Sequence, residues 1–85
     1  FQLNQNYPNP FNPTTIISYY LPISTNVKLK IYNSLGEEIK VLVDNFQNKG
    51  YYEIEFNANN LSSGIYFYAL ETPNKIISKK MLLLK

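Results

Sequence analysis

Apolar and polar residues alternate with a period of two along most of this 85-residue chain, as expected for half-buried β-strands. No stretch of helical length repeats its apolar positions every 3.6 residues or so. The alternation predicts a short strand near Gln2–Gln5 and six longer ones: Thr14–Leu21, Val27–Tyr32, Glu37–Val43, Tyr51–Phe56, Ile65–Leu70 and Ile76–Leu84. Turn chemistry separates the last five strands at Asn33–Gly36, Asp44–Gly50, Asn57–Gly64 and Thr72–Lys75.

The same alternation predicts which side chains face the core. The side chains of Lys28 and Lys30 are expected to be exposed to solvent, and those of Glu53 and Glu55 are expected to lie on an outward face. The predicted strand Ile65–Leu70 is apolar on both faces and is therefore expected in the middle of a sheet. The inward positions expected in three strands are Ile17, Tyr19, Leu21, Val27, Leu29, Ile31, Tyr52, Ile54 and Phe56.

Residues 1–13 form a different kind of segment, because three prolines fall within the six positions from Pro8 to Pro13. Each proline fixes φ and removes a hydrogen-bond donor, so neither a helix nor a central strand is possible there. We expect an extended segment whose Tyr7 and Phe11 pack onto a sandwich body of residues 14–85.

Short strands with turns about every 8–12 residues are typical of an all-β, immunoglobulin-like antiparallel sandwich of about seven strands. The chain has room for one domain. Tyr66 closely follows the Leu61–Gly64 connection, as in the tyrosine corner of such folds, where the hydroxyl bonds back to the backbone.

The net charge is +2, and all eight basic residues are lysine. Without arginine, and with so weak a basic excess, nucleic-acid binding is not expected. No run reaches the length of a membrane helix, and the first residues lack the features of a signal peptide. If the protein is exported, its export signal is expected upstream of Phe1.

The chain contains neither histidine nor cysteine, so the common general base, thiolate nucleophiles and imidazole or thiolate metal ligands are missing. Glu53 and Glu55 are interpreted as a solvated strand face rather than a paired acid site. No calcium-loop spacing and no phosphate-binding glycine loop occurs. We expect no enzyme activity, no catalytic residue, no metal and no cofactor.

Three tyrosines expected to face outward, Tyr20, Tyr32 and Tyr51, could form a platform for sugars or proteins. Cross-strand packing is the favoured interpretation, because no single face collects all three.

Four stretches, in order and spacing, resemble the type A C-terminal sorting domain of type IX (Por) secretion. They are Tyr7–Thr15, Val27–Gly36, Leu61–Tyr66 and Lys79–Lys85, and the resemblance covers essentially the whole chain. It implies a module fused to the end of a large exported cargo protein of Bacteroidota or related phyla. The resemblance also implies passage from the periplasm through the outer-membrane translocon to the cell surface or medium. A sortase-like peptidase commonly removes the module, here at or before Phe1.

Residue by residue, the resemblance implies a mainly structural role for the first three motifs: Pro8, Asn9, Pro10, Phe11, Leu35, Gly36, Gly64 and Tyr66. Recognition by the translocon or the peptidase is implied for the last motif: Lys79, Lys80, Met81, Leu83 and Lys85. The last strand both completes a sheet and offers an edge to a partner. Ala69 departs from the family, which often carries a basic residue at that position.

Two alternatives remain open on the sequence alone. One is a carbohydrate- or protein-binding sandwich appended to a secreted enzyme, and the other is a structural module like the immunoglobulin-like domain of flagellar hook-capping proteins.

Overall fold

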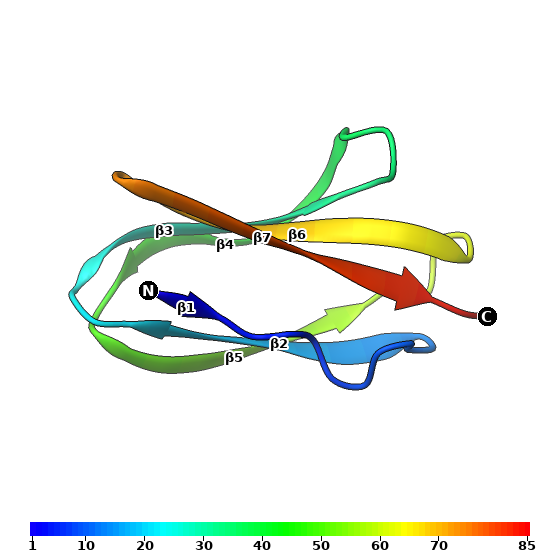
Figure 1. The fold of residues 1–85 in the computed structure, drawn as a ribbon, viewed down its shortest axis with the longest axis horizontal. Helices are drawn as coiled ribbons and strands as arrows, with labels where there is room; N and C mark the ends of the chain where they lie inside the picture. The colour runs from blue at the N-terminus through cyan, green and yellow to red at the C-terminus, as the bar shows by residue number, and fades with distance from the viewer.

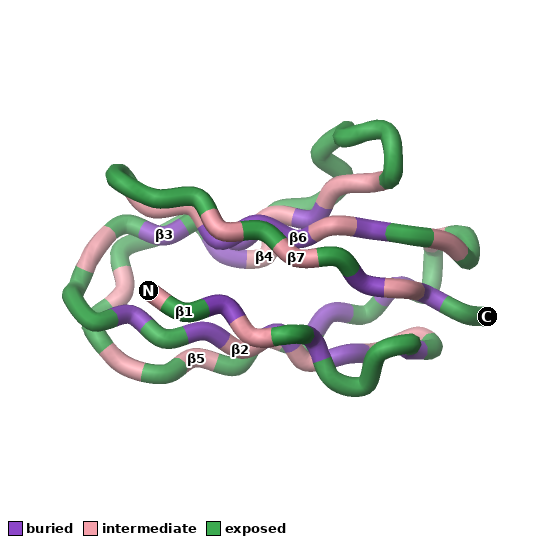
Figure 2. Tube along the Cα trace, in the orientation of Figure 1, coloured by how far each residue is buried: buried purple, intermediate pink, exposed green.

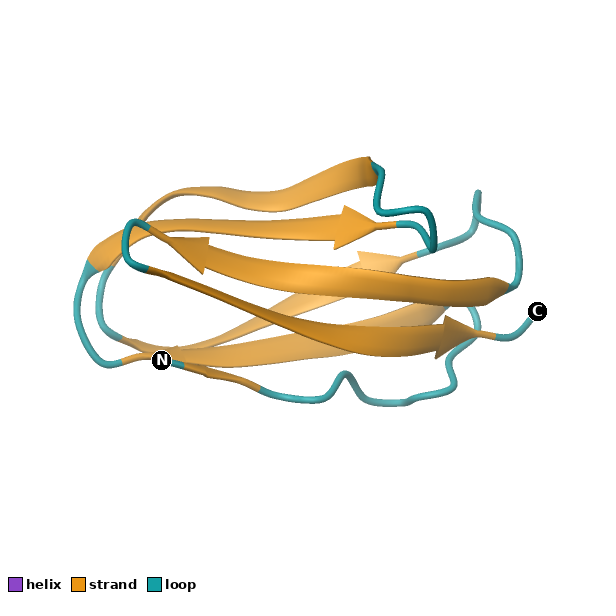
Figure 3. Ribbon diagram, turned by 45° about the horizontal axis from the view of Figure 1, so that its top comes forward, coloured by secondary structure: helices purple, strands orange, loops and turns teal.

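The structure, a computed structural model, describes residues 1–85 and contains strands, turns and loops but no helix (Figure 3). The strands are β1 (Gln2–Leu3), β2 (Thr14–Leu21), β3 (Thr25–Tyr32), β4 (Glu38–Gln47), β5 (Gly50–Asn57), β6 (Gly64–Thr72) and β7 (Lys75–Leu83). The predicted all-β class is confirmed. No helix is present that could cross a membrane.

The strands form two antiparallel sheets that lie face to face as a sandwich (Figure 1). The smaller sheet has the order β1-β2-β5, and the larger has the order β4-β3-β6-β7. β6 lies between β3 and β7, so the predicted central position of this doubly apolar strand is confirmed. The body measures 37 × 23 × 16 Å.

The core lies between the sheets and follows the predicted alternation (Figure 2). β2 and β3 each turn every second side chain inward, as the burial of Ile17, Tyr19, Leu29 and Ile31 shows. Lys28 is exposed, whereas Lys30 is partly covered because its ammonium group contacts the carboxylate of Glu38 at 3.1 Å.

The β3–β4 hairpin forms around the predicted turn. Gly36 has φ +83°, a left-handed conformation that glycine adopts without steric cost. Its N–H donates to the carbonyl oxygen of Asn33 at 3.0 Å. The side-chain oxygen of Asn33 accepts from the N–H groups of Leu35 and Glu37, each at 3.0 Å.

β4 continues four residues beyond the predicted strand, because Asp44–Gln47 pairs with β3 rather than forming a loop. The prediction was wrong here because backbone pairing does not require alternation. β4 is an edge strand, and Asp44–Phe46 is exposed to solvent. Two register shifts in the β3–β4 ladder mark irregularities typical of sheet edges.

Tyr66 forms the predicted tyrosine corner. Its hydroxyl donates to the carbonyl oxygen of Ser62 at 2.7 Å, four residues upstream. Leu61 packs against the core, so both apolar and polar contacts hold the connection from β5 to β6.

Phe11 and Tyr7 have different environments. Phe11 is only 2% exposed and lies in the core, as predicted. Tyr7 is 80% exposed, so its predicted packing on the body was wrong. The backbone of Tyr7 pairs with Ile16 of β2, which fixes the segment through main-chain bonds and leaves the ring outside.

Candidate recognition surface

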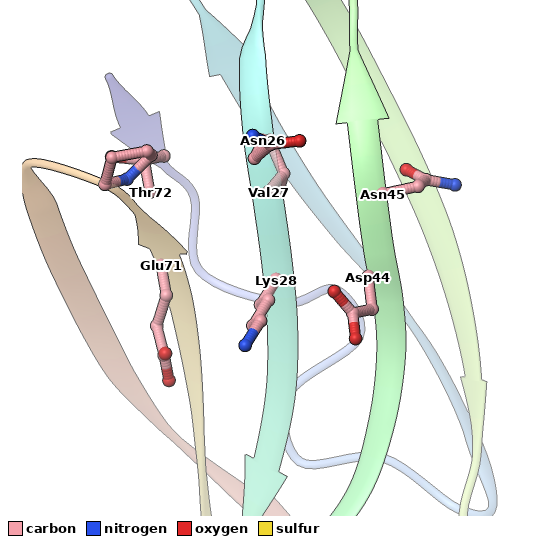
Figure 4. A pocket seen from close by; sticks show the side chains of 8 residues that line it. Asn26, Val27, Lys28, Asp44, Asn45, Glu71 and Thr72 are labelled. Atoms are coloured by element: carbon pink, nitrogen blue, oxygen red, sulfur yellow. The ribbon is translucent and has the colours of Figure 1, made fainter.

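The molecule has two surface hollows. The larger one, about 410 Å³, lies on the outer face of the larger sheet (Figure 4). It places Lys28 beside Asp44 and Glu71, so its charges are mixed. No three histidine, cysteine, aspartate or glutamate residues are grouped to hold a metal ion.

β7 contains most of the residues that the sequence singles out for recognition. Met81 and Leu83 are 1% and 0% exposed and belong to the core, so a folded domain presents neither side chain. Lys80 and Lys85 are exposed, and Lys79 is half-buried. The strand therefore divides into an inward set that stabilises the fold and an outward set that a partner can touch.

The outward side of β7 carries apolar residues that sequence reasoning did not select. Leu82 lies opposite Ile65 in the β6–β7 ladder, and Lys80 lies opposite Phe67. Leu84, just after the strand, is 51% exposed. We call this surface the terminal patch: Ile65, Phe67, Lys80, Leu82 and Leu84. The period of two could have identified it, since fixing Met81 inward turns Leu82 outward.

The proline-rich segment closes the edge of β7 next to this patch. The side-chain oxygen of Asn9 accepts from the Leu82 N–H at 2.9 Å. The Phe11 N–H donates to the Leu82 carbonyl oxygen, and the Leu84 N–H donates to the Phe11 carbonyl oxygen, both at 3.0 Å. The first and last motifs of the sequence are therefore in direct contact, and this part of the β7 edge is occupied.

A buried polar network anchors the segment to the core. The Asn6 N–H donates to the hydroxyl oxygen of Tyr68 at 2.8 Å, and this hydroxyl donates to the Asn4 carbonyl oxygen at 2.6 Å. The Asn6 amide donates to Thr15 Oγ1 and to the Pro8 carbonyl oxygen. Burial raises the pKa of Tyr68 to about 12. The sequence pattern gave no indication of this network.

The third motif also meets the last one. Gly64 pairs with Leu83 in the β6–β7 ladder. The N–H of Lys85 donates to Ser63 Oγ at 2.9 Å, and its ammonium group donates to the Asn59 carbonyl oxygen. Leu35 and Gly36 instead lie on the β3–β4 turn, which projects from the body (Figure 1). Three of the four motifs thus converge at one end of the sandwich.

The lysines of β7 have no acidic partner. The strand contains no aspartate or glutamate, and both ion pairs of the structure involve Lys30. Lys75, Lys79 and Lys80 therefore add positive charge along one edge of the larger sheet.

The three outward tyrosines do not share a face. Tyr20 and Tyr51 pair across β2 and β5 with ring centroids 5.5 Å apart. Tyr32 lies on the other sheet and donates to Glu71 at 2.9 Å. Cross-strand packing accounts for the Tyr20–Tyr51 pair, in agreement with the favoured interpretation.

The comparisons with known proteins give one result. A search of the curated proteins and a search of the solved structures found no match. The family model of the secretion system C-terminal sorting domain matches residues 5–84, nearly the whole chain. The chain therefore belongs to the secretion system C-terminal sorting domain family and is a C-terminal sorting signal for type IX secretion.

Proposed function

We propose that the outer-membrane translocon recognises this domain by binding the terminal patch and the nearby lysines Lys80 and Lys85. The observation that supports this proposal most directly is the C-terminal end of β7, where half-buried Leu82 and exposed Leu84 lie near Lys80 and Lys85, neither of which has an acidic partner. Exposed apolar residues that gather on one surface are characteristic of binding sites. Lys79 lies at the same edge and adds charge.

The position of the patch suits a module that must work with a large cargo. A C-terminal sorting domain follows its cargo, so the cargo lies on the N-terminal side of β1. The N-terminus and the C-terminal end lie at opposite ends of the sandwich (Figure 1). A surface at the end of β7 is therefore at the far end of the sandwich from the junction with the cargo.

We further propose that the domain passes through the periplasm and that a sortase-like peptidase removes it at or before Phe1. Peptidases bind extended, unpaired chain. From Asn6 to Phe11 the backbone is bonded to β2, β7 and Tyr68, which protects it from cleavage. The chain upstream of β1 is the nearest segment without such restraint.

The test is export of a periplasmic reporter protein fused to this chain, in a strain with a working translocon. Deleting Ile76–Lys85 removes the buried Met81 and Leu83, so it tests folding as well as recognition. The sharper variant is the double substitution Leu82→Ser with Leu84→Ser. We expect at least a tenfold fall in exported reporter, with thermal unfolding close to that of the wild type.

The matched control is Val41→Ser, which changes an exposed apolar residue on β4, at the opposite edge of the same sheet. It should leave export unchanged. Normal export of the double variant, or equal loss with the Val41 control, contradicts recognition through the terminal patch.

A further inference from the structure

The free edge of β7 is only partly covered. In an antiparallel ladder, alternate residues direct their N–H and C=O groups to opposite sides of the strand. Leu82 directs both groups away from β6, toward the proline-rich segment. The β6–β7 register is unbroken from Gly64 to Lys75, so the backbone groups of Ile76 and Ser78 point the same way.

β1 lies close to β7, but no hydrogen bond within the chain occupies these groups. The proline-rich segment reaches as far as the Lys80 carbonyl oxygen, where the Gln5 side chain donates at 2.7 Å. Neither Ile76 nor Ser78 takes part in a hydrogen bond outside the ladders. Both side chains are exposed, that of Ile76 by 71%. We call Ile76–Lys80 the open edge.

The charges beside the open edge select among possible strand partners. Lys75 precedes it, Lys79 and Lys80 lie within it, and no acid on the strand balances them. Glu71 of β6, opposite Ile76, contacts Lys30 and Tyr32 instead. Lys79 lies opposite the buried Tyr68, so it sits on the inner side of an edge strand, a position that disfavours pairing between copies. A second copy would bring lysines against lysines, whereas glutamate or aspartate on an added strand would meet them favourably.

We propose that the open edge is a strand-addition site, to which an extended acidic segment of the translocon that recognises the domain binds. This rests on the proposed function, because it assumes that the translocon contacts β7. Main-chain bonds to Ile76 and Ser78 supply affinity, and the lysines supply selectivity for acidic residues. The contact of Gln5 with Lys80 sets the limit of pairing, so a strand of about five residues fits.

The first experiment uses the 85-residue chain and an amidated heptapeptide that alternates glutamate with threonine or valine. Amide hydrogen exchange by NMR reports each backbone group separately. We expect the peptide to slow exchange at Ile76 and Ser78, and to leave Leu82 and Leu84 unchanged, because their N–H groups are already bonded. A peptide with lysine in place of glutamate should bind at least tenfold more weakly.

The second experiment uses Ser78→Pro, with Ser78→Ala as the matched control. The Ser78 N–H makes no bond to β6, so proline removes the open-edge donor without breaking the ladder. We expect proline to weaken binding of the glutamate peptide roughly tenfold, and alanine to leave it unchanged. Lys79→Glu, which keeps every backbone group, should weaken binding to a similar degree.

Three results would overturn the strand-addition site: equal binding of both peptides, no protection at Ile76 and Ser78, or dimerisation of the chain through these same amides. The proposed function is tested separately, since Leu82→Ser with Leu84→Ser should lower export at least tenfold and still bind the peptide. Loss of export in that variant, together with normal export of a folded Ser78→Pro variant, refutes the open edge alone.

Discussion

The hydroxyl group of Tyr68 organises a large part of the N-terminal chain. It donates to the Asn4 carbonyl oxygen and accepts from the Asn6 N–H, although these residues lie more than sixty positions upstream. Asn6 in turn bonds to Thr15, and both are almost fully buried. Buried polar groups are costly unless they are paired, so the members of this network stabilise one another.

Substituting Tyr68→Phe removes both bonds and leaves the Asn6 N–H buried without a partner. We expect the free energy of unfolding, measured in urea, to fall by about 2–3 kcal/mol. Tyr66→Phe is the matched control, because its hydroxyl makes one bond, to Ser62, and should cost about 1 kcal/mol. Equal losses in the two variants would contradict the role of the network.

The same hydroxyl makes stability depend on alkaline pH. Burial raises the pKa of Tyr68 from its ordinary value of 10.0 to about 12, so the unfolded chain releases this proton first. The contribution of Tyr68 is complete below pH 10 and falls as pH rises toward 12. Between these values we expect the urea midpoint of the wild type to fall more steeply than that of Tyr68→Phe, which retains every other titrating group. Parallel curves would show that Tyr68 does not contribute.

The strands β2 and β7 differ in how much of their structure, bounds and exposed side chains alike, the sequence predicts. The bounds and facing of β2 follow directly from alternation, because one face meets the core and the other meets water. For β7 the sequence predicts the strand but not which residues it exposes, and Met81 and Leu83 prove to be buried. The docking of the proline-rich segment on β7 could not be predicted, since main-chain bonds leave no periodic pattern in the side chains.

The bond from Leu82 to Asn9 allows the docking of that segment to be measured. Asn9→Ala removes the acceptor of the Leu82 N–H, and we expect its amide exchange to become roughly tenfold faster. The Leu84 amide, bonded to the Phe11 carbonyl oxygen, should change less. Asn12→Ala, an exposed position in the same segment, is the control and should leave both amides unchanged. Uniform acceleration of all amides would indicate global destabilisation instead.

Across the whole molecule, charge is distributed unevenly between the two sheets. Lys49 lies in the β4–β5 turn, and the other seven lysines lie on the larger sheet or just after it: Lys28, Lys30, Lys40, Lys75, Lys79, Lys80 and Lys85. Glu38, Asp44 and Glu71 offset three of these charges, whereas β5 in the smaller sheet carries Glu53 and Glu55 and no lysine. The larger sheet is therefore the more positive face of the molecule, the side that an acidic surface would attract.

The contact between Phe11 and β7 also determines how the domain resists force. Phe11 runs parallel to Leu83 and is bonded on either side of it, to Leu82 and Leu84. A force applied on the N-terminal side draws this segment backward, while an opposing force at the C-terminal end draws β7 forward. The two strands then slide against each other, and the load falls on their bonds together rather than one after another. A sorting signal built in this way resists being pulled by its two ends and keeps its sandwich folded.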